Sequence, residues 1–443
     1  MKLERKISVI IPCYNIEKYI SICLESFLRQ TLQDFEIICV DDGSTDKTAE
    51  IIENYSYINN KIKLIRQTNQ YAGVARNNGL KNAKGKYVLF FDGDDFCDEN
   101  MFTEMVASAE KHNSDIVVCD VQTYDDQTGK YDRSVPFFRE SLVRDYKDVG
   151  IVSYHDIPDN ILLLASSGPW NKLYRKSFIV QQELEFQASK RDNDEYFVLM
   201  SMALAEKISW VPKKFVTYRV NNPNSLQGFG EENIDTVDML STVQELRNGL
   251  IKKGRYELVK KSFQNQVLVR YVGLIEAQRS WENYKKIFDF TKNYVFTEFE
   301  INQMRSDEVF MRAEERKKIL ESNAEEYLFW QMRKMKYGHG ERYIFPYREI
   351  VGAKTIGLYG AGMVGQAYYR QIKEVSSISL SGWYDKNYDF IANKDYSIQS
   401  PDQIAPEKMD RIVIAVESGD VAKIIKQMLL NKGFEEKNII WSI

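Results

Sequence analysis

The 443-residue sequence is poor in histidine and has no long apolar run, and each shortage excludes a class of protein. Only three histidines are present, which argues against zinc sites and against catalysis built on this residue. No stretch approaches about 18 consecutive apolar residues, the minimum for a membrane-spanning helix. Five cysteines, an odd number without paired metal-ligand spacing, predict reduced, buried thiols and a cytoplasmic protein. A net charge of −4 gives no global attraction for nucleic acid.

Strand-like and helix-like segments alternate over the first 120 or so residues. Apolar runs rich in valine, isoleucine and phenylalanine are the expected strands: ISVIIP, FEIICVDDG, IKLIRQ, YVLFFDGDD and DIVVCD. Continuous apolar strands that alternate with helices are typical of an α/β fold with a parallel sheet covered on both faces. Ligands of such sheets bind beyond the carboxyl ends of the strands.

Three regions follow from the pattern along the chain. We expect one α/β domain over residues 1–228, whose second half is rich in loops. Residues 229–349 have helical periodicity and almost no glycine or proline, which predicts a helical domain or linker bundle. Residues 350–443 return to strand–helix alternation and predict a small Rossmann-like α/β domain.

Carboxylates gather at two of the expected strand ends. Asp42 lies in VDDGSTD, where Ser44 or Thr45 could cap the following helix, so that the extra acid would need no further role. In YVLFFDGDD, Asp92 and Asp94 with a third aspartate follow an apolar run. Crowded carboxylates repel one another, and a divalent cation with a phosphate ligand relieves that cost. The alternative is a solvated acidic loop.

The N-terminal motifs together resemble the family 2 glycosyltransferases with the GT-A fold. The resemblance covers about residues 6–105 closely and extends less closely to 228, with ISVIIPCYN, ICVDDGSTD, AGVARNNGL and YVLFFDGDD in order. It implies a nucleoside pocket lined by Pro12, Tyr14 and Asp42.

The same resemblance assigns the middle of the expected site. Arg76 would lie near the nucleotide-sugar, although a surface helix arginine is the alternative. Asp92 and Asp94 would form the Asp-x-Asp pair, with Asp92 nearer the ribose or sugar. Asp94 would be the ligand of Mn²⁺ or Mg²⁺.

A catalytic base is expected in SKRDNDEYF. The family usually has a Glu-Asp pair there, and Asp194 aligns with its aspartate, whereas Asn193 replaces the glutamate. Asp192 and Glu195 remain alternatives for the base, and these carboxylates could instead only cap the next helix.

Two further segments match family motifs. GPWNKLYRKSF carries Trp170 and Lys172, which would contact donor or acceptor, or be a packed tryptophan and a surface lysine. YRVNNPNSL, near Tyr218, resembles the loop that closes over the diphosphate, but lacks its usual histidine.

The resemblance implies an inverting, metal-dependent transferase. Its donor would be a nucleotide-sugar, most plausibly a UDP-sugar. Its acceptor would be a hydroxyl of a bacterial cell-surface polysaccharide or a related, lipid-linked glycan precursor. The basic, aromatic stretch at 331–348 would then rest on the inner face of the cell membrane, or serve as an interdomain packing element.

Near the C-terminus, Gly360, Gly362 and Gly365 follow an apolar run, and Asp385 follows the next. This spacing is the dinucleotide-binding fingerprint, so NAD(P) is an alternative ligand that would make the protein bifunctional. Another alternative is a non-catalytic module for homo-oligomerisation. Tyr369 and Lys373 have the spacing of a dehydrogenase pair, but they lie on the first helix after the glycines, where that pair does not occur.

Overall fold

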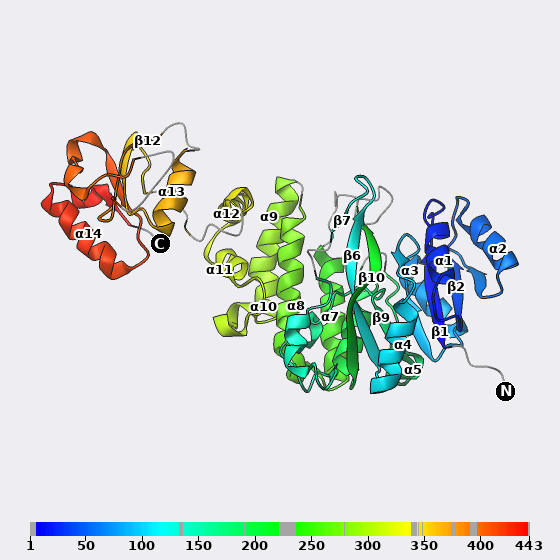
Figure 1. Cartoon of the computed structure of the whole chain (residues 1–443). Coiled ribbons are helices and arrows are strands. Elements are labelled where there is room, and N and C mark those ends of the chain that lie inside the picture. Colours follow the sequence, from blue (N-terminus) through cyan, green and yellow to red (C-terminus); the bar gives the residue numbers. More distant parts are fainter. Residues whose placement is uncertain are drawn as a thin grey trace. The chain divides into compact units, whose positions relative to one another are not determined.

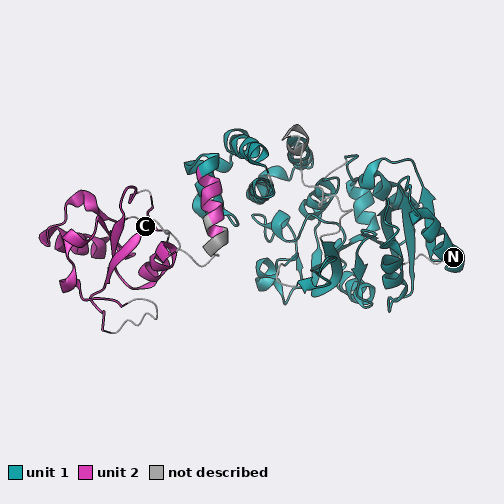
Figure 2. Cartoon of the chain, turned by 90° about the horizontal axis from the view of Figure 1, so that it is seen from above, with its two compact units in different colours: residues 1–325 teal, residues 326–443 magenta. Residues whose placement is uncertain are grey.

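The computed structural model describes residues 6–132, 136–189, 192–220, 236–278, 280–337, 343, 345–347, 349–373, 378–389 and 397–441. The chain forms two compact units, Met1–Glu325 and Glu326–Ile443 (Figure 2). The helices that follow residue 236 therefore belong, up to Glu325, to the same unit as the first sheet. Among the described helices, none is both long and apolar enough to cross a membrane.

Unit 1 is built on a mixed sheet in the order β3-β2-β1-β4-β9-β6-β10-β5, with β7 on β6 and β8 on β10. The strands are β1 (Ile7–Cys13), β2 (Phe35–Asp41), β3 (Ile62–Arg66), β4 (Tyr87–Phe90), β5 (Phe96–Cys97), β6 (Ile116–Asp125), β7 (Tyr131–Asp132), β8 (Ile151–Val152), β9 (Lys172–Arg175) and β10 (Ile208–Val220). All five predicted N-terminal strands are present. β6 and β10 run side by side as the longest pair (Figure 1).

The five predicted strands, β1 to β4 and β6, run in one direction, as predicted, and a strand from later in the chain lies among them. β1 to β4 are parallel, but β9 enters between β4 and β6 and runs antiparallel to both. The strand is short and its residues arrive from far along the chain, so no local pattern marks its direction. Its insertion brings the segment before β9 beside the acidic strand ends.

Helices of unit 1 cover this sheet and extend it. They are α1 (Ile20–Leu28), α2 (Thr48–Ile58), α3 (Tyr71–Asn82), α4 (Met101–His112), α5 (Lys176–Gln182), α6 (Glu195–Leu204), α7 (Thr236–Lys252), α8 (Tyr256–Glu276), α9 (Trp281–Phe290), α10 (Phe296–Glu298) and α11 (Ala313–Glu321). α4 shows why: Met101, Met105 and Ala109 recur every four residues and are buried against the sheet. All five cysteines are buried and reduced, as predicted.

Unit 2 begins within α12 (Ala324–Tyr337) and holds a second, four-stranded parallel sheet. The strand order is β12 (Ser379–Tyr384), β11 (Thr355–Tyr359), β13 (Arg411–Ile414) and β14 (Ile439–Ile440). α13 (Met363–Lys373) packs on one face and α14 (Gly419–Asn431) on the other (Figure 1). The strand–helix alternation predicted for 350–443 is confirmed.

Candidate active site

The loops after β1 and β2 are tied together at the carboxyl edge of the first sheet. Asn15 is the link: its backbone N–H donates to Ser44 Oγ (3.1 Å), and its side chain accepts from the Thr45 N–H (2.8 Å). Ser44 and Thr45 therefore do not cap α2, which begins at Thr48, and the predicted cap is wrong. These bonds hold the two loops in one rigid edge.

Asp42 lies within this edge, directly after β2. Its side chain is buried, and Oδ1 accepts from Gln67 Nε2 (2.8 Å) and from the Gln70 N–H (2.9 Å). Pro12, within β1, is partly buried, whereas Tyr14 just beyond β1 is 49% exposed. A fixed carboxylate beside an open aromatic ring suits recognition of a planar, hydrogen-bonding ligand.

Arg76 connects two acidic loops from the buried side. It lies on α3, is 4% exposed, and donates to Asp92 Oδ1 (2.6 Å) and Asn193 Oδ1 (2.7 Å). The surface-arginine alternative is therefore wrong. Asn193, where the family usually has glutamate, is a neutral acceptor, so the buried guanidinium bonds to one carboxylate, that of Asp92. The bridge joins the loop after β4 to the segment before α6.

The acidic loop after β4 concentrates carboxylates of different burial. Asp92 and Asp94 are partly exposed, whereas Asp95 is buried. Asp95 Oδ1 accepts from the Arg219 N–H (2.8 Å), and its buried Oδ2 has no hydrogen-bond partner. Burial first, then Asp94 and Asp92, raise the pKa of Asp95 well above its ordinary value.

These residues fit a hard divalent cation in their chemistry, because Mg²⁺ and Mn²⁺ prefer oxygen ligands. Among the described residues, however, no group of three or more histidine, cysteine, aspartate or glutamate side chains could hold a metal ion. Oxygen atoms of a bound diphosphate would have to complete the shell around a cation held by Asp94.

Arg219, which the sequence did not single out, fixes the acidic loop from β10. Its Nε donates to the Asp94 carbonyl oxygen (2.9 Å), and its guanidinium pairs with Asp126. The Tyr19 ring lies 4.8 Å from the guanidinium carbon, and Tyr19 Oη also donates to Asp126 (3.1 Å). In the sequence, the one available signal for this role was an arginine at a position within a strand, where a buried side chain is expected. Residues 221–235, which include most of the segment that resembles the family's diphosphate loop, lie outside the described residues.

Asp194 occupies the position before the first turn of α6, and its side chain makes no capping bond there. Burial raises the pKa of Asp194 to about 6; Arg76 opposes this, while Asp92 and Glu195 add to it. The alternatives for the base, Asp192 and Glu195, are both ion-paired with Arg270 of α8. Asp194 is therefore the carboxylate in this segment that faces the Arg76–Asp92 pair without a salt bridge to Arg270.

The WNK segment before and within β9 is packed rather than open. Lys172 is fully buried, and its Nζ donates to Ser166 O (2.7 Å), Gly168 O (2.8 Å) and Asn171 Oδ1 (2.8 Å). The surface-lysine alternative is wrong, and burial lowers the pKa of Lys172 to about 7. Trp170 stacks on Tyr218 with ring centroids 5.4 Å apart. The hydrogen bonds of Lys172 thus fix the loop that carries Trp170.

The glycine turn of unit 2 is built differently. A Cβ on Gly360 would lie 2.5 Å from Ala415 O, and one on Gly365 only 1.9 Å from Gly360 O, whereas Gly362 faces open space. Asp385, directly after β12, accepts from the Ala361 N–H (2.7 Å) and the Asn387 N–H (2.8 Å). Tyr369 stacks on Trp383 in the core, so its dehydrogenase-like spacing from Lys373 has a packing explanation.

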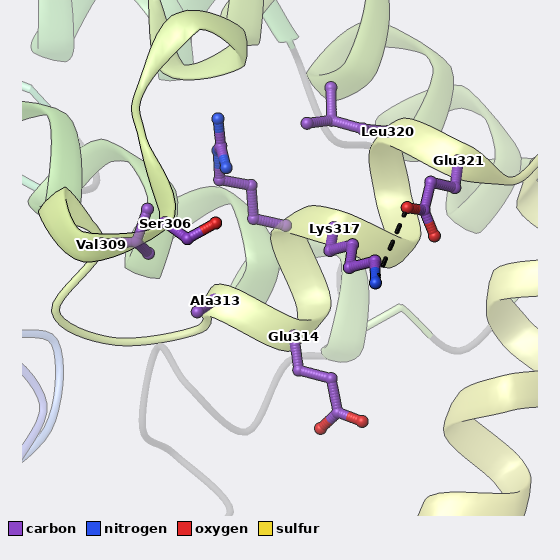
Figure 3. Close-up of a pocket in the computed structure, with 8 residues that line it drawn as sticks. Ser306, Val309, Ala313, Glu314, Lys317, Leu320 and Glu321 are labelled. Carbon is purple, nitrogen blue, oxygen red and sulfur yellow. Dashed lines mark ion pairs between the residues drawn. The ribbon is translucent and has the colours of Figure 1, made fainter. Parts of the chain in front are cut away.

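A cavity of about 330 Å³ lies elsewhere in unit 1, around α11 (Figure 3). Arg316 in its wall donates to the carbonyl oxygens of Ile301, Asn302 and Met304, and Lys317 pairs with Glu321. Its lining contains none of the residues predicted for the site, and its Arg316, Lys317 and Glu321 bind the local backbone or each other.

Comparison with known proteins agrees with this geometry. Residues 8–162 match the family model described as glycosyl transferase family 2. "Uncharacterized glycosyltransferase EpsJ" of Bacillus subtilis is 34% identical over 221 residues, covering 50% of this chain and 62% of EpsJ. The poly(ribitol-phosphate) beta-N-acetylglucosaminyltransferase TarS of Staphylococcus aureus is 30% identical over 219 residues, covering 48% of this chain and 35% of TarS. The match spans less than two thirds of either relative.

The fold has a counterpart among solved structures. The crystal structure of S. aureus TarS 1–349 in complex with UDP-GlcNAc is similar with a TM-score of 0.54 at 21% identity. The similarity covers 74% of this chain and 92% of that one. The first sheet is accordingly a GT-A sheet, as the sequence predicted.

Proposed function

We propose that the protein is an inverting glycosyltransferase that moves a sugar from a nucleotide-sugar, namely a UDP-sugar, to an acceptor hydroxyl. The observation that carries the proposal is the Arg76 bridge between Asp92 and Asn193. The acidic loop after β4 and the segment that bears Asp194 are thereby both bonded to one buried guanidinium group, that of Arg76. The carboxylates that we propose to bind the donor and the proposed base would then share one site.

The donor would lie across the carboxyl edge of the sheet. Asp42, held by Gln67 and Gln70, would accept a hydrogen bond from the base, with Pro12 and Tyr14 beside the nucleoside. Arg76 and Asp92 would face the ribose and sugar. Mn²⁺ or Mg²⁺ held by Asp94 would neutralise the charge of the diphosphate.

Asp194 would act as general base. The acceptor oxygen attacks the anomeric carbon, the bond from that carbon to the diphosphate oxygen breaks, and the hydroxyl proton passes to Asp194. One displacement from the face opposite the leaving group inverts the configuration. A carboxyl group with a pKa of about 6 is deprotonated at neutral pH yet basic enough to take the proton.

The names of the relatives support the acceptor class. TarS and a Bacillus spizizenii relative are named as transferases that act on poly(ribitol-phosphate), with N-acetylglucosamine and glucose respectively. We infer that this protein also modifies a bacterial cell-surface polymer or a lipid-linked precursor of one. Contact of the 331–348 segment with a membrane remains part of this proposal, although most of its side chains lie outside the described residues.

A second candidate function concerns unit 2. The open environment of Gly362, beside two tightly packed glycines, favours approach of a ligand phosphate, as in NAD(P)-binding folds. Asp385, which would bind a ribose there, already accepts two backbone N–H groups, and we therefore rank a role in self-association or interaction above a cofactor. Equilibrium dialysis of NAD⁺ and NADP⁺ against the full chain separates the two.

A donor screen tests the main proposal. Wild type is incubated with UDP-, GDP- and dTDP-sugars, each with Mn²⁺, Mg²⁺ or EDTA, and release of the nucleoside diphosphate is measured. We expect turnover of one donor class that EDTA abolishes and that Asp94→Ala and Asp194→Asn both lose. Full activity of both variants with that donor would refute the assignment.

A further inference from the structure

We propose that Arg270, in the helical part of unit 1, is a positioning residue of the transferase site that fixes the segment carrying Asp194. This inference rests on the proposed function of Asp194. It assigns a role in transfer to α8, which lies well outside residues 8–162 of the family match.

The contacts of Arg270 bracket Asp194. One guanidinium nitrogen, Nη2, donates to Asp192 Oδ2 (2.7 Å), and the other, Nη1, donates to Glu195 Oε2. The side chains of Arg270 and Glu195 are 11% and 8% exposed, so this pair is largely removed from water. Asp192 is 40% exposed, so the fork joins a buried carboxylate to a partly exposed one. A guanidinium held by two carboxylates fixes geometry more strongly than a single surface ion pair does.

The backbone of the segment needs such a restraint. Asp192 has a φ of +53°, a left-handed conformation that residues with a Cβ adopt at a cost. The ion pair with Arg270 compensates that cost and sets the direction in which the chain enters α6. Asp194, two residues on, takes its position from this entry.

Two arginines from different elements divide the segment between them. Arg76 of α3 bonds to Asn193, and Arg270 of α8 bonds to Asp192 and Glu195. Within residues 192–195, Asp194 is thus the side chain that neither arginine binds, and it is left for substrate. The segment is therefore bonded both to α3 of the sheet region and to α8 of the helical region.

Charge gives Arg270 a second effect. Asp194 is influenced by Arg76, Asp92 and Glu195, and it in turn acts on Lys172 and Tyr174 of β9 and on Tyr218 of β10. Arg270 neutralises Glu195, the acid next to Asp194. Removing its charge would leave Asp192 and Glu195 uncompensated, and their repulsion would raise the pKa of Asp194 further.

The test uses the full chain with the donor and metal that give turnover in wild type. Arg270→Met, Arg270→Lys and Arg247→Met are compared by kcat, KM and the pH dependence of kcat between pH 5 and 9. Arg247 is the matched control, since it pairs with Glu298 in the same helical region (2.8 Å), and none of its hydrogen bonds or ion pairs within the described part of the chain reaches residues 192–195.

We expect Arg270→Met to lower kcat on the order of tenfold or more, because the base is misplaced, with little change in the KM for the donor. The acidic limb of its kcat–pH profile should move to higher pH by about half a pH unit or more. Arg270→Lys, which keeps the charge but not the fork, should lower kcat and leave the limb in place. Arg247→Met should match wild type in both.

Each outcome decides the matter. If wild type turns over no nucleotide-sugar, the proposed function fails before the role of Arg270 is reached. If wild type is active, and Arg270→Met folds and has the same kcat and the same pH midpoint as wild type, the positioning role is wrong. Should Arg270→Met not fold, as judged by circular dichroism, Arg270→Lys decides: unchanged kcat overturns the proposal, and reduced kcat at an unchanged midpoint supports it.

Discussion

The acidic loop after β4 in unit 1 and the glycine turn after β11 in unit 2 each follow a parallel strand, the first leading into β5 and the second into α13. Their polar groups are treated in opposite ways. In unit 1 a buried oxygen of Asp95 has no partner, and burial raises the pKa of Asp194 to about 6. In unit 2, Asp385 accepts two backbone N–H groups, and Trp383 Nε1 donates to Gly360 O (2.7 Å).

The difference separates a site from a structural turn. Unsatisfied buried carboxylates oppose folding, and they persist where a bound ligand or a reaction requires them. A turn whose hydrogen bonds are complete has less to offer a ligand. The glycine spacing is the more familiar signature in the sequence, yet the buried carboxylates favour unit 1 as the location of the proposed chemistry.

Exchange of one carboxylate in each unit should give the largest contrast. Asp194→Asn removes the proposed base and should lower kcat by about 10²–10⁴-fold, since general bases contribute that much. Asp385→Asn is the matched change in unit 2 and should leave kcat unaltered. Both are measured by donor turnover with acceptor under the conditions of wild type. Equal losses in the two variants would remove the distinction between the units.

Substitution of one glycine by alanine in each unit should sharpen the contrast between the two units. A Cβ at position 73 would lie 2.1 Å from Gln187 O, and one at position 365 would lie 1.9 Å from Gly360 O. Both alanine variants should lose about 1–3 kcal/mol of stability through overpacking. Gly73→Ala should also reduce kcat, because Gly73 packs on Asn193 beside the proposed base, whereas Gly365→Ala should not. Thermal unfolding with turnover measures both; loss of activity in Gly365→Ala alone would contradict the assignment.

Local patterns predicted the strands and several strand-end residues well. Asp42 and Asp92 lie where the apolar runs of β2 and β4 end. They could be predicted because a continuous apolar run marks both the extent of a buried strand and its two ends. Arg219 and Arg270 were not predictable. They reach the site from β10 and α8, more than 70 residues from the groups they bind, and such pairings depend on tertiary packing alone. The same holds for the insertion of β9.

A smaller effect should appear in the stability of unit 2. Asp385→Asn keeps one acceptor oxygen but loses the charge, so the Ala361 N–H or the Asn387 N–H is left with a weaker partner. We expect a loss of about 0.5–1.5 kcal/mol. Urea unfolding followed by fluorescence of Trp383, after the other tryptophans are replaced with phenylalanine, reports on unit 2. An unchanged midpoint would mean that the turn does not depend on this carboxylate.

The pH dependence of the free energy of unfolding should show how much the ionised carboxylate of Asp194 destabilises the folded protein. Its pKa in the folded protein is about 6, above the ordinary 3.8, so the folded state holds the proton more tightly than the unfolded chain. Its contribution to the free energy of unfolding is therefore fully present below about pH 4 and is lost as the pH rises through 6. Asp194→Asn should be more stable than wild type at pH 7.5, by about 1–3 kcal/mol relative to their difference at pH 4. Asp159→Asn, an exposed change, should show no such pH-dependent difference in urea unfolding. If Asp194→Asn shows none either, burial does not oppose its charge, and the contrast between the two units loses its electrostatic basis.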